Sequence, residues 1–118
     1  MPNLLINIDV DDIEAATRFY TAAFELRVGR RFDTQFVELL GAEVPIYLLQ
    51  KQPGTLPFEG ADAGRSYAPH WTGVHLDLVV EDIDVAITRA LAAGATLEQA
   101  AKQAPYGKLA LLRDPFGH

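Results

Sequence analysis

The sequence predicts an α+β fold, in which two tandem β-α-β-β-β modules form a curled mixed sheet. The first fifty residues carry a strand pattern, a helix pattern and three further strand patterns, in that order. The opening strand and helix patterns recur at an offset of 70 residues, so that Asp12 aligns with Asp82. A shared core pattern in the same order indicates two copies of one supersecondary unit.

The first module begins with an alternating segment, Asn3 to Val10, which predicts a strand. Asp11 and Asp12 follow, and either carboxylate suits the N-cap of a helix. Apolar residues at helical spacing then predict a helix from Ile13 to about Phe24. Three more strands are expected at Glu25 to Phe32, Gln35 to Leu40 and Glu43 to Gln50, separated by the Asp33-Thr34 turn and Gly41.

The segment Lys51 to Pro69 has a different composition, with several prolines and glycines and little periodicity. Two interpretations stay open at this point. The segment is either a linker between two halves or a loop that folds over a site.

The second module repeats the opening pattern. His70 to Val80 is expected to form a strand, Asp82 to cap a helix, and Gly94 to end it. Two later strands are expected at Ala95 to Ala100 and Lys108 to Arg113, with a loop at Gln103 to Gly107. The final residues Asp114 to His118 have turn chemistry.

The second module lacks a counterpart of the strand Glu43 to Gln50. That strand either follows His118 in a longer chain or is supplied by a partner, because an unpaired sheet edge promotes association. We expect a single domain, with module 1 at residues 1–50, the loop at 51–69 and module 2 at 70–118.

Composition excludes several functional classes. The chain has 16 acidic and 10 basic side chains, a formal net charge of −6, which argues against a nucleic-acid partner. The absence of cysteine excludes disulfides, thiolate nucleophiles and zinc-thiolate sites. We find no signal peptide and no apolar run of membrane-spanning length, so we expect a cytoplasmic protein without a membrane partner.

The repeated unit resembles the vicinal oxygen chelate superfamily, which includes glyoxalase I, bleomycin-resistance and fosfomycin-resistance proteins and extradiol dioxygenases. The residues that carry the resemblance are VDDIEAATRFY at 10–20, GVHLDLVVEDID at 73–84 and DPFGH at 114–118. The resemblance covers nearly the whole chain. It implies the glyoxalase/bleomycin-resistance fold, a sheet whose concave side holds the pocket while the helices pack on its convex side, and a homodimer.

Strand parity predicts which polar residues face the pocket. Leu76, Leu78 and Val80 are uniformly aliphatic and are expected to face the helix, which leaves His75 and Asp77 on the opposite face. In the first module the same face carries Asn7 and Asp9, so we expect these four polar side chains to converge. Such a cluster would need a ligand, water or a metal as partner.

The resemblance also allows the metal site of glyoxalase I to be carried over by position. It implies one ligand from each opening strand and one from each closing strand. The second opening strand places His75 there, a good ligand, but the first places Leu5, which has no donor atom. The first closing strand places Tyr47, a poor match, and the fourth position lies past His118. One good ligand is fewer than the three donors that a metal site normally needs, so we expect no cofactor and keep a divalent metal at His75 as the alternative.

Aromatic and acidic side chains complete the candidate pocket. Trp71 shares the parity of His75, and Phe36, Glu38 and Tyr47 lie in the predicted strands of the first module. His75 and Trp71 also have structural interpretations without a ligand. His75 could equally be a hydrogen-bonded histidine of a strand, and Trp71 could pack under the loop or at a dimer interface. The predicted ligand-binding set is Asn7, Asp9, Phe36, Glu38, Tyr47, Trp71, His75 and Asp77.

Three functions are compatible with these features. The first is a small-molecule binder of the bleomycin-resistance type, which holds an aromatic or cationic compound without chemistry. The second is a metal-dependent lyase, isomerase or dioxygenase of the glyoxalase kind with a non-standard site. The third is a subunit whose pocket is vestigial and whose role is assembly. The missing ligands favour the first function over the second.

Overall fold

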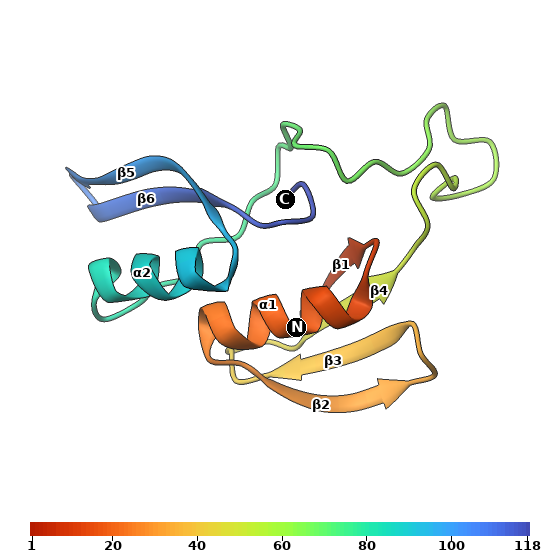
Figure 1. Cartoon of the computed structure of the whole chain (residues 1–118), viewed down its shortest axis with the longest axis horizontal. Coiled ribbons are helices and arrows are strands. Elements are labelled where there is room, and N and C mark those ends of the chain that lie inside the picture. The colour runs from red at the N-terminus through yellow and green to blue at the C-terminus, as the bar shows by residue number, and fades with distance from the viewer.

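A computed structural model describes all residues from 1 to 118, and it confirms the α+β class (Figure 1). The two helices, α1 (Ile13–Phe24) and α2 (Ile83–Ala93), pack against each other at the centre. A four-stranded sheet lies on one side of the helices and a two-stranded hairpin on the other (Figure 1). Neither helix is long and apolar enough to cross a bilayer.

The four-stranded sheet contains β1 (Ile6–Val10), β2 (Arg27–Phe32), β3 (Phe36–Leu40) and β4 (Ile46–Gln50). Its strand order is β1-β4-β3-β2, so the last strand of the module lies between the first and the third. β4 runs parallel to β1 and antiparallel to β3. This is the mixed sheet that the sequence predicts.

The helix α1 forms where its pattern places it. The Asp12 side chain caps its N-terminus by accepting a hydrogen bond from the Ala15 amide at 3.0 Å. Glu25 ends it in the left-handed conformation, with φ of 56°, so β2 begins later than the predicted Glu25. The buried face of α1 packs on the alternate residues Ile8, Val10, Val37, Leu39, Ile46 and Leu48 of the sheet.

The second half contains α2 and the hairpin of β5 (Thr96–Ala104) and β6 (Gly107–Arg113). Asp82 caps α2 through the amides of Asp84 and Val85, and Gly94 ends it with φ of 122°, as predicted. The predicted loop at Gln103 to Gly107 shortens to the two-residue turn Pro105-Tyr106, because β5 extends to Ala104.

The prediction of a strand from His70 to Val80 is wrong in this structure. The segment has no regular secondary structure and belongs to no sheet, and none of its backbone groups makes a backbone–backbone hydrogen bond. The physical reason is the absence of a neighbour, since a strand requires a partner for its ladder. The predicted parity holds in part, because Leu76, Leu78 and Val80 are less exposed than Val79.

The hydrophobic core lies almost entirely in the first half. Ala90 and Phe116 are the only members of the core cluster that follow β4. Phe116 reaches the core because the final turn docks on α1, where its ring packs edge-on to Phe19 at 6.4 Å. Gly117 allows this docking: a Cβ there would lie 2.7 Å from the carbonyl oxygens of Tyr67 and Ala68.

Candidate functional site

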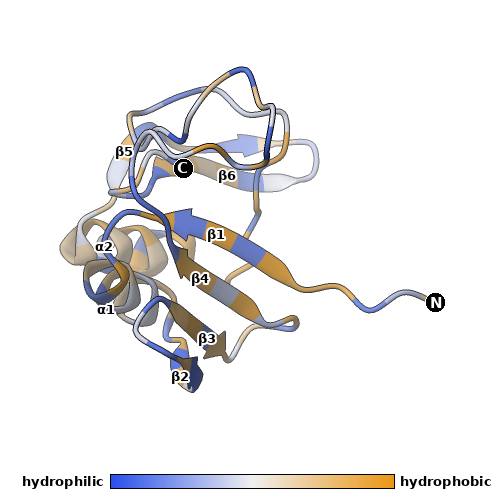
Figure 2. Ribbon diagram, turned by 90° about the vertical axis from the view of Figure 1, so that its right-hand side faces the viewer, coloured by the Kyte–Doolittle hydropathy of each residue, from blue (hydrophilic) through white to orange (hydrophobic).

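The face of the sheet that points away from α1 carries five of the predicted ligand-binding residues. Strand pairing places Asn7 of β1 opposite Tyr47 of β4, and Tyr47 opposite Glu38 of β3. Asp9, two residues after Asn7, and Phe36, two residues before Glu38, lie on the same face. Figure 2 shows this sheet with the helices gathered on its other side.

The centre of this face is a hydrogen-bonded cluster of Glu38, Arg30 and Tyr47. The Arg30 side chain donates to both oxygens of Glu38, from Nε to Oε1 at 3.1 Å and from Nη2 to Oε2 at 2.9 Å. The Arg30 amide also donates to Oε1 at 3.1 Å, and the Tyr47 hydroxyl donates to Oε2 at 3.0 Å. A carboxylate with this many donors is satisfied although Glu38 is only 6% exposed.

The cluster holds Glu38 in its ionised form. Hydrogen bonds from Arg30, first from its side chain and then from its amide, lower the pKa of Glu38 to about 2. The same contacts raise the pKa of Arg30 above its ordinary value. The pair therefore presents a neutralised surface with one partly exposed guanidinium, rather than an open negative charge.

Three aromatic rings form a row beside this cluster. The ring of Phe36 lies 5.1 Å from that of Phe32 in β2 and 5.2 Å from that of Tyr47 in β4. The Arg30 guanidinium lies over the Phe32 ring at 5.0 Å. Phe32 is 43% exposed, so one end of the row is open to solvent. The face thus combines flat apolar area with a cation and a phenol.

The loop Lys51 to Pro69 is tied to the edge of this face. Arg65 donates from Nε to the Asp9 carboxylate at 2.9 Å and from Nη1 to the Leu56 carbonyl at 2.9 Å. Tyr67 donates to the Lys51 carbonyl at 2.6 Å, and burial raises its pKa. These contacts anchor the segment beside the sheet, and its role as a linker between halves or as a loop over a site stays a prediction. Asp9 is consequently engaged by the loop.

The remaining predicted residues lie apart from the cluster. His75 and Asp77 stand on the unpaired segment, where their side chains are 74% and 71% exposed and 3.8 Å from each other. No hydrogen bond or ion pair joins them to Asn7 or Asp9. Trp71 is 88% exposed, so its ring is packed neither under the loop nor in the core.

Sequence reasoning missed two arginines. Arg30 is not in the predicted ligand-binding set, yet it holds Glu38. The available signal was that its predicted strand is followed by the strand that carries this acidic residue. A β-bulge between Val28 and Arg31 shifts the register there, which strand parity did not anticipate. Arg65 lies in an aperiodic loop, and nothing in the local sequence indicates its pairing with Asp9.

The residues present do not fit the metal that the resemblance implies. Leu5 offers no donor, and the Tyr47 phenol is hydrogen-bonded to Glu38 and Arg30. His75 is exposed, with its Nδ1 atom 3.8 Å from Asp77 Oδ1. No group of three or more histidine, aspartate or glutamate side chains is arranged to hold a metal ion.

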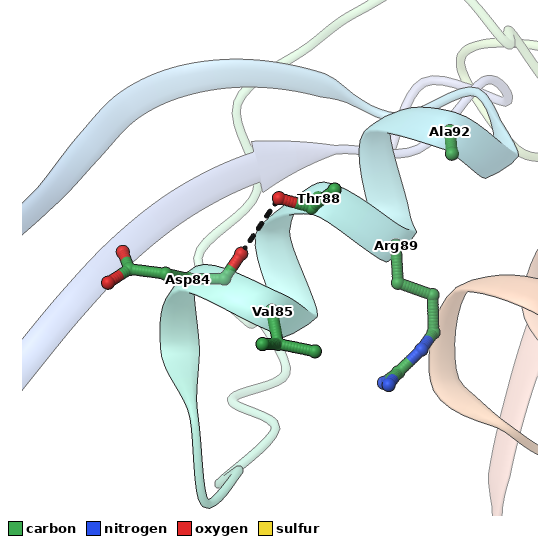
Figure 3. A pocket seen from close by; sticks show the side chains of 5 residues that line it. All are labelled: Asp84, Val85, Thr88, Arg89 and Ala92. Carbon is green, nitrogen blue, oxygen red and sulfur yellow. Dashed lines mark hydrogen bonds between the residues drawn. The ribbon is translucent and has the colours of Figure 1, made fainter.

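A shallow hollow lies on the exposed side of α2, away from the cluster (Figure 3). The one side-chain hydrogen bond between lining residues joins the Thr88 hydroxyl to the Asp84 carbonyl at 3.0 Å. The side chains around it diverge, as expected for a helix surface (Figure 3). It is lined by Asp84, Val85, Thr88, Arg89 and Ala92. We therefore assign no chemistry to this hollow.

Solved structures share the fold over the whole chain. A hypothetical protein from S. aureus matches with a TM-score of 0.73 and 18% identity, covering 100% of this chain and 92% of the other. A glyoxalase-related enzyme from Fulvimarina pelagi matches at 0.72 and 20%, covering 100% and 84%. Lactoylglutathione lyase from Agrobacterium tumefaciens matches at 0.63 and 22%, covering 98% and 87%. At these identities the likeness shows the fold alone.

The family assignment rests on the sequence of the chain. No curated protein matches it. The family model described as a glyoxalase-like domain matches residues 5–118, nearly the whole length. The chain therefore belongs to the glyoxalase-like domain family, within the vicinal oxygen chelate superfamily that its repeated strand and helix resemble.

Proposed function

We propose that this protein binds a small aromatic molecule on the open face of the sheet β1-β4-β3-β2, without a metal. The observation that carries the proposal is the row of Phe32, Phe36 and Tyr47 beside the Arg30–Glu38 pair. Flat apolar area with a few oriented polar groups is the usual composition of a small-molecule site. The ordered loop anchored on Asp9 borders the same face.

The charge of the cluster favours an aromatic ligand that carries a hydrogen-bond acceptor. A cationic ligand would have to displace Arg30, because both Glu38 oxygens are already occupied. The Nη1 atom of Arg30 makes no hydrogen bond, and the side chain is 64% exposed. A carboxylate, carbonyl or phenolate on the ligand would pair with this donor while the ring stacks on the aromatic row.

Thermal-shift measurements test this proposal with defined probes. Salicylate represents an aromatic acid, and bleomycin represents a cationic glycopeptide. We expect salicylate to raise the melting temperature in a concentration-dependent way, since a ligand that binds only the folded state stabilises it by mass action. Phe36→Ala should remove this rise, whereas the matched control Phe58→Ala, in the exposed loop, should keep it.

Three outcomes would count against the proposal. A response to bleomycin alone that survives Phe36→Ala would favour a cationic ligand elsewhere on the molecule. A flat screen with both probes and further aromatic acids would favour a role in assembly. A stoichiometric divalent ion in protein purified without chelator, lost in His75→Ala, would restore the metal-dependent lyase or isomerase. We expect metal analysis to give well under one ion per chain, because the donors do not converge.

A further inference from the structure

One line of side chains crosses the open face of the first sheet from edge to edge. Strand pairing places Asp9 of β1 opposite Leu49 of β4, and Leu49 opposite Phe36 of β3. Phe36 in turn lies opposite Phe32 of β2. Three strand spacings, about 14 Å, separate the two ends of this line. Its middle is apolar, with a carboxylate at one end and an aromatic ring at the other.

An arginine stands at each end of this line, and each keeps a free donor. Arg65 pairs with Asp9 at 2.9 Å, while Arg30 lies over the Phe32 ring at 5.0 Å and pairs with Glu38. Arg65 donates only from Nε and Nη1, which leaves its Nη2 atom without a partner. Arg30 donates only from its amide, Nε and Nη2, which leaves its Nη1 atom free.

The free donor of Arg65 is accessible and held in place. No buried side-chain nitrogen or oxygen lacks a hydrogen bond, so the unpaired Nη2 atom of this half-buried residue is open to solvent. The Arg65 amide donates to the Thr55 carbonyl at 2.8 Å, and its carbonyl accepts from the Gly54 amide at 2.8 Å. A Cβ at Gly64 would collide with the Gly54 carbonyl, so glycine allows the two sides of the loop to close. The loop thus positions a guanidinium before any ligand arrives.

The charges on this face favour an anionic ligand. Arg27 lies opposite Leu40, which alternates with the core residue Leu39 and therefore shares the open face. Arg27 makes no ion pair, whereas the other two arginines of the face each pair with one carboxylate. The cations therefore exceed the carboxylates here, although the whole chain has a formal net charge of −6. A local excess of one sign attracts ligands of the other.

We propose, on the basis of the ligand site proposed above, that the ligand is an aromatic dicarboxylate. Arg30 binds one carboxylate through Nη1, Arg65 binds the other through Nη2, and the ring lies on Phe36 and Leu49 between them. Arg65 is then a specificity-determining residue that the loop contributes to the face. A ligand with a single carboxylate uses only one of the two charged donors, and hydrogen bonds between charged partners are the strong ones.

Isothermal titration calorimetry at physiological ionic strength tests this assignment with two probes. Terephthalate has carboxylates at both ends of its ring, and benzoate has one. We expect terephthalate to bind about tenfold more tightly than benzoate, because it makes one more charged hydrogen bond. Arg65→Gln should abolish this advantage and leave the affinity for benzoate unchanged. The matched control is Arg31→Gln on the other face of β2, where the side chain pairs with Glu14, and it should keep the advantage.

Asp9→Asn separates ligand binding by Arg65 from its role in holding the loop. The substitution weakens the anchor of the loop, but it also removes a carboxylate that competes with the ligand for Arg65. If Arg65 binds the ligand, Asp9→Asn should bind terephthalate at least as tightly as the wild type, while Arg65→Gln binds it about tenfold more weakly. Equal weakening in the two variants would show that Arg65 only holds the loop, and would overturn the assignment.

The two probes also distinguish failure of this assignment from failure of the proposed function. Benzoate binding that is lost in Phe36→Ala, together with equal affinity for terephthalate, would overturn the second donor and leave the aromatic site standing. Absence of binding by both probes would count against the aromatic site and the dicarboxylate together. Tighter binding of terephthalate that depends on both Arg65 and Phe36 supports both.

Discussion

The Tyr20 hydroxyl of α1 donates a hydrogen bond of 2.5 Å to the Asp114 carboxylate, which lies 94 residues later in the chain. The contact joins the first module to the last turn, and the aromatic contact of Phe19 with Phe116 lies beside it. Burial, and after it the charge of Asp114, raises the pKa of Tyr20 above its ordinary value. The last turn thus docks on α1 through a hydrogen bond to a charged acceptor and an aromatic contact, in addition to the packing of α2 on α1.

Tyr20→Phe should destabilise the protein by about 2 kcal/mol, because a hydrogen bond to a charged acceptor contributes about 1.5–3 kcal/mol. Urea unfolding followed by circular dichroism measures the loss. Because the pKa of Tyr20 is raised in the folded state, the stabilisation by its neutral hydroxyl is complete below the ordinary tyrosine pKa. This stabilisation is lost as pH rises above about 10. The wild type should therefore lose more stability between pH 9 and pH 11 than Tyr20→Phe does. Equal losses would contradict the role of this hydroxyl.

Glu38→Gln should change the acid sensitivity of the protein. Because the pKa of Glu38 is lowered to about 2, its contribution to stability is present above the ordinary carboxyl pKa and is lost as pH falls toward 2. Between pH 6 and pH 2.5, the wild type should lose more stability than Glu38→Gln. Titration of the Glu38 side-chain carboxyl by NMR checks the cause directly, and a midpoint near 4 would show that Arg30 does not hold it.

Gly29→Ala should disturb the same cluster by steric means. A Cβ at this position would lie 2.6 Å from Glu38 Oε1 and 2.8 Å from Leu40 Cδ1, so the carboxylate must move. We expect the pKa of Glu38 to rise toward its ordinary value, with a loss of about 1 kcal/mol of stability. Gly73→Ala is the matched control, because its Cβ would meet only the Trp71 ring at 3.4 Å. An unchanged Glu38 titration in Gly29→Ala would be inconsistent with the observed packing.

Asp9→Asn should loosen the loop Lys51 to Pro69. The Arg65 side chain is 17% exposed and pairs with Asp9 at 2.9 Å, so loss of the charge weakens the anchor of the loop. If the free energy of loop opening falls by about 1 kcal/mol, the open population rises about fivefold. Thermolysin should then cleave near Leu56 and Phe58 about fivefold faster. The control is Glu14→Gln, which removes the exposed 3.5 Å pair with Arg31 and should leave cleavage unchanged. Equal cleavage of Asp9→Asn and wild type would mean that the other Arg65 contacts suffice.

Much of the secondary structure was predictable from local patterns. Asp12 and Asp82 cap the helices that follow them, and Gly94 ends the second. Capping and periodicity act over a few residues, so the sequence displays them directly. The position of Phe36, Glu38 and Tyr47 on one sheet face also follows from alternation along β3 and β4.

The contacts of Arg30 and Arg65 were not predictable, because a bulge and an irregular loop set them. The lack of a strand neighbour for His70–Val80 was likewise not predictable. Its alternation predicts a strand, but a ladder needs a neighbouring strand, and none lies beside it.

Sequence patterns alone were sufficient to predict the repeated unit, the family, the helix boundaries and the polar face of the first sheet. These depend on short-range periodicity and on positions that match across the two modules. The three-dimensional contacts were needed to show that Arg30 neutralises Glu38, that the loop is anchored to Asp9, and that Gly73–Val80 pairs with no strand. The first depends on a β-bulge in β2, the second on a contact between residues 56 positions apart, and the third on the absence of a neighbouring strand, and local pattern carries no signal for any of these.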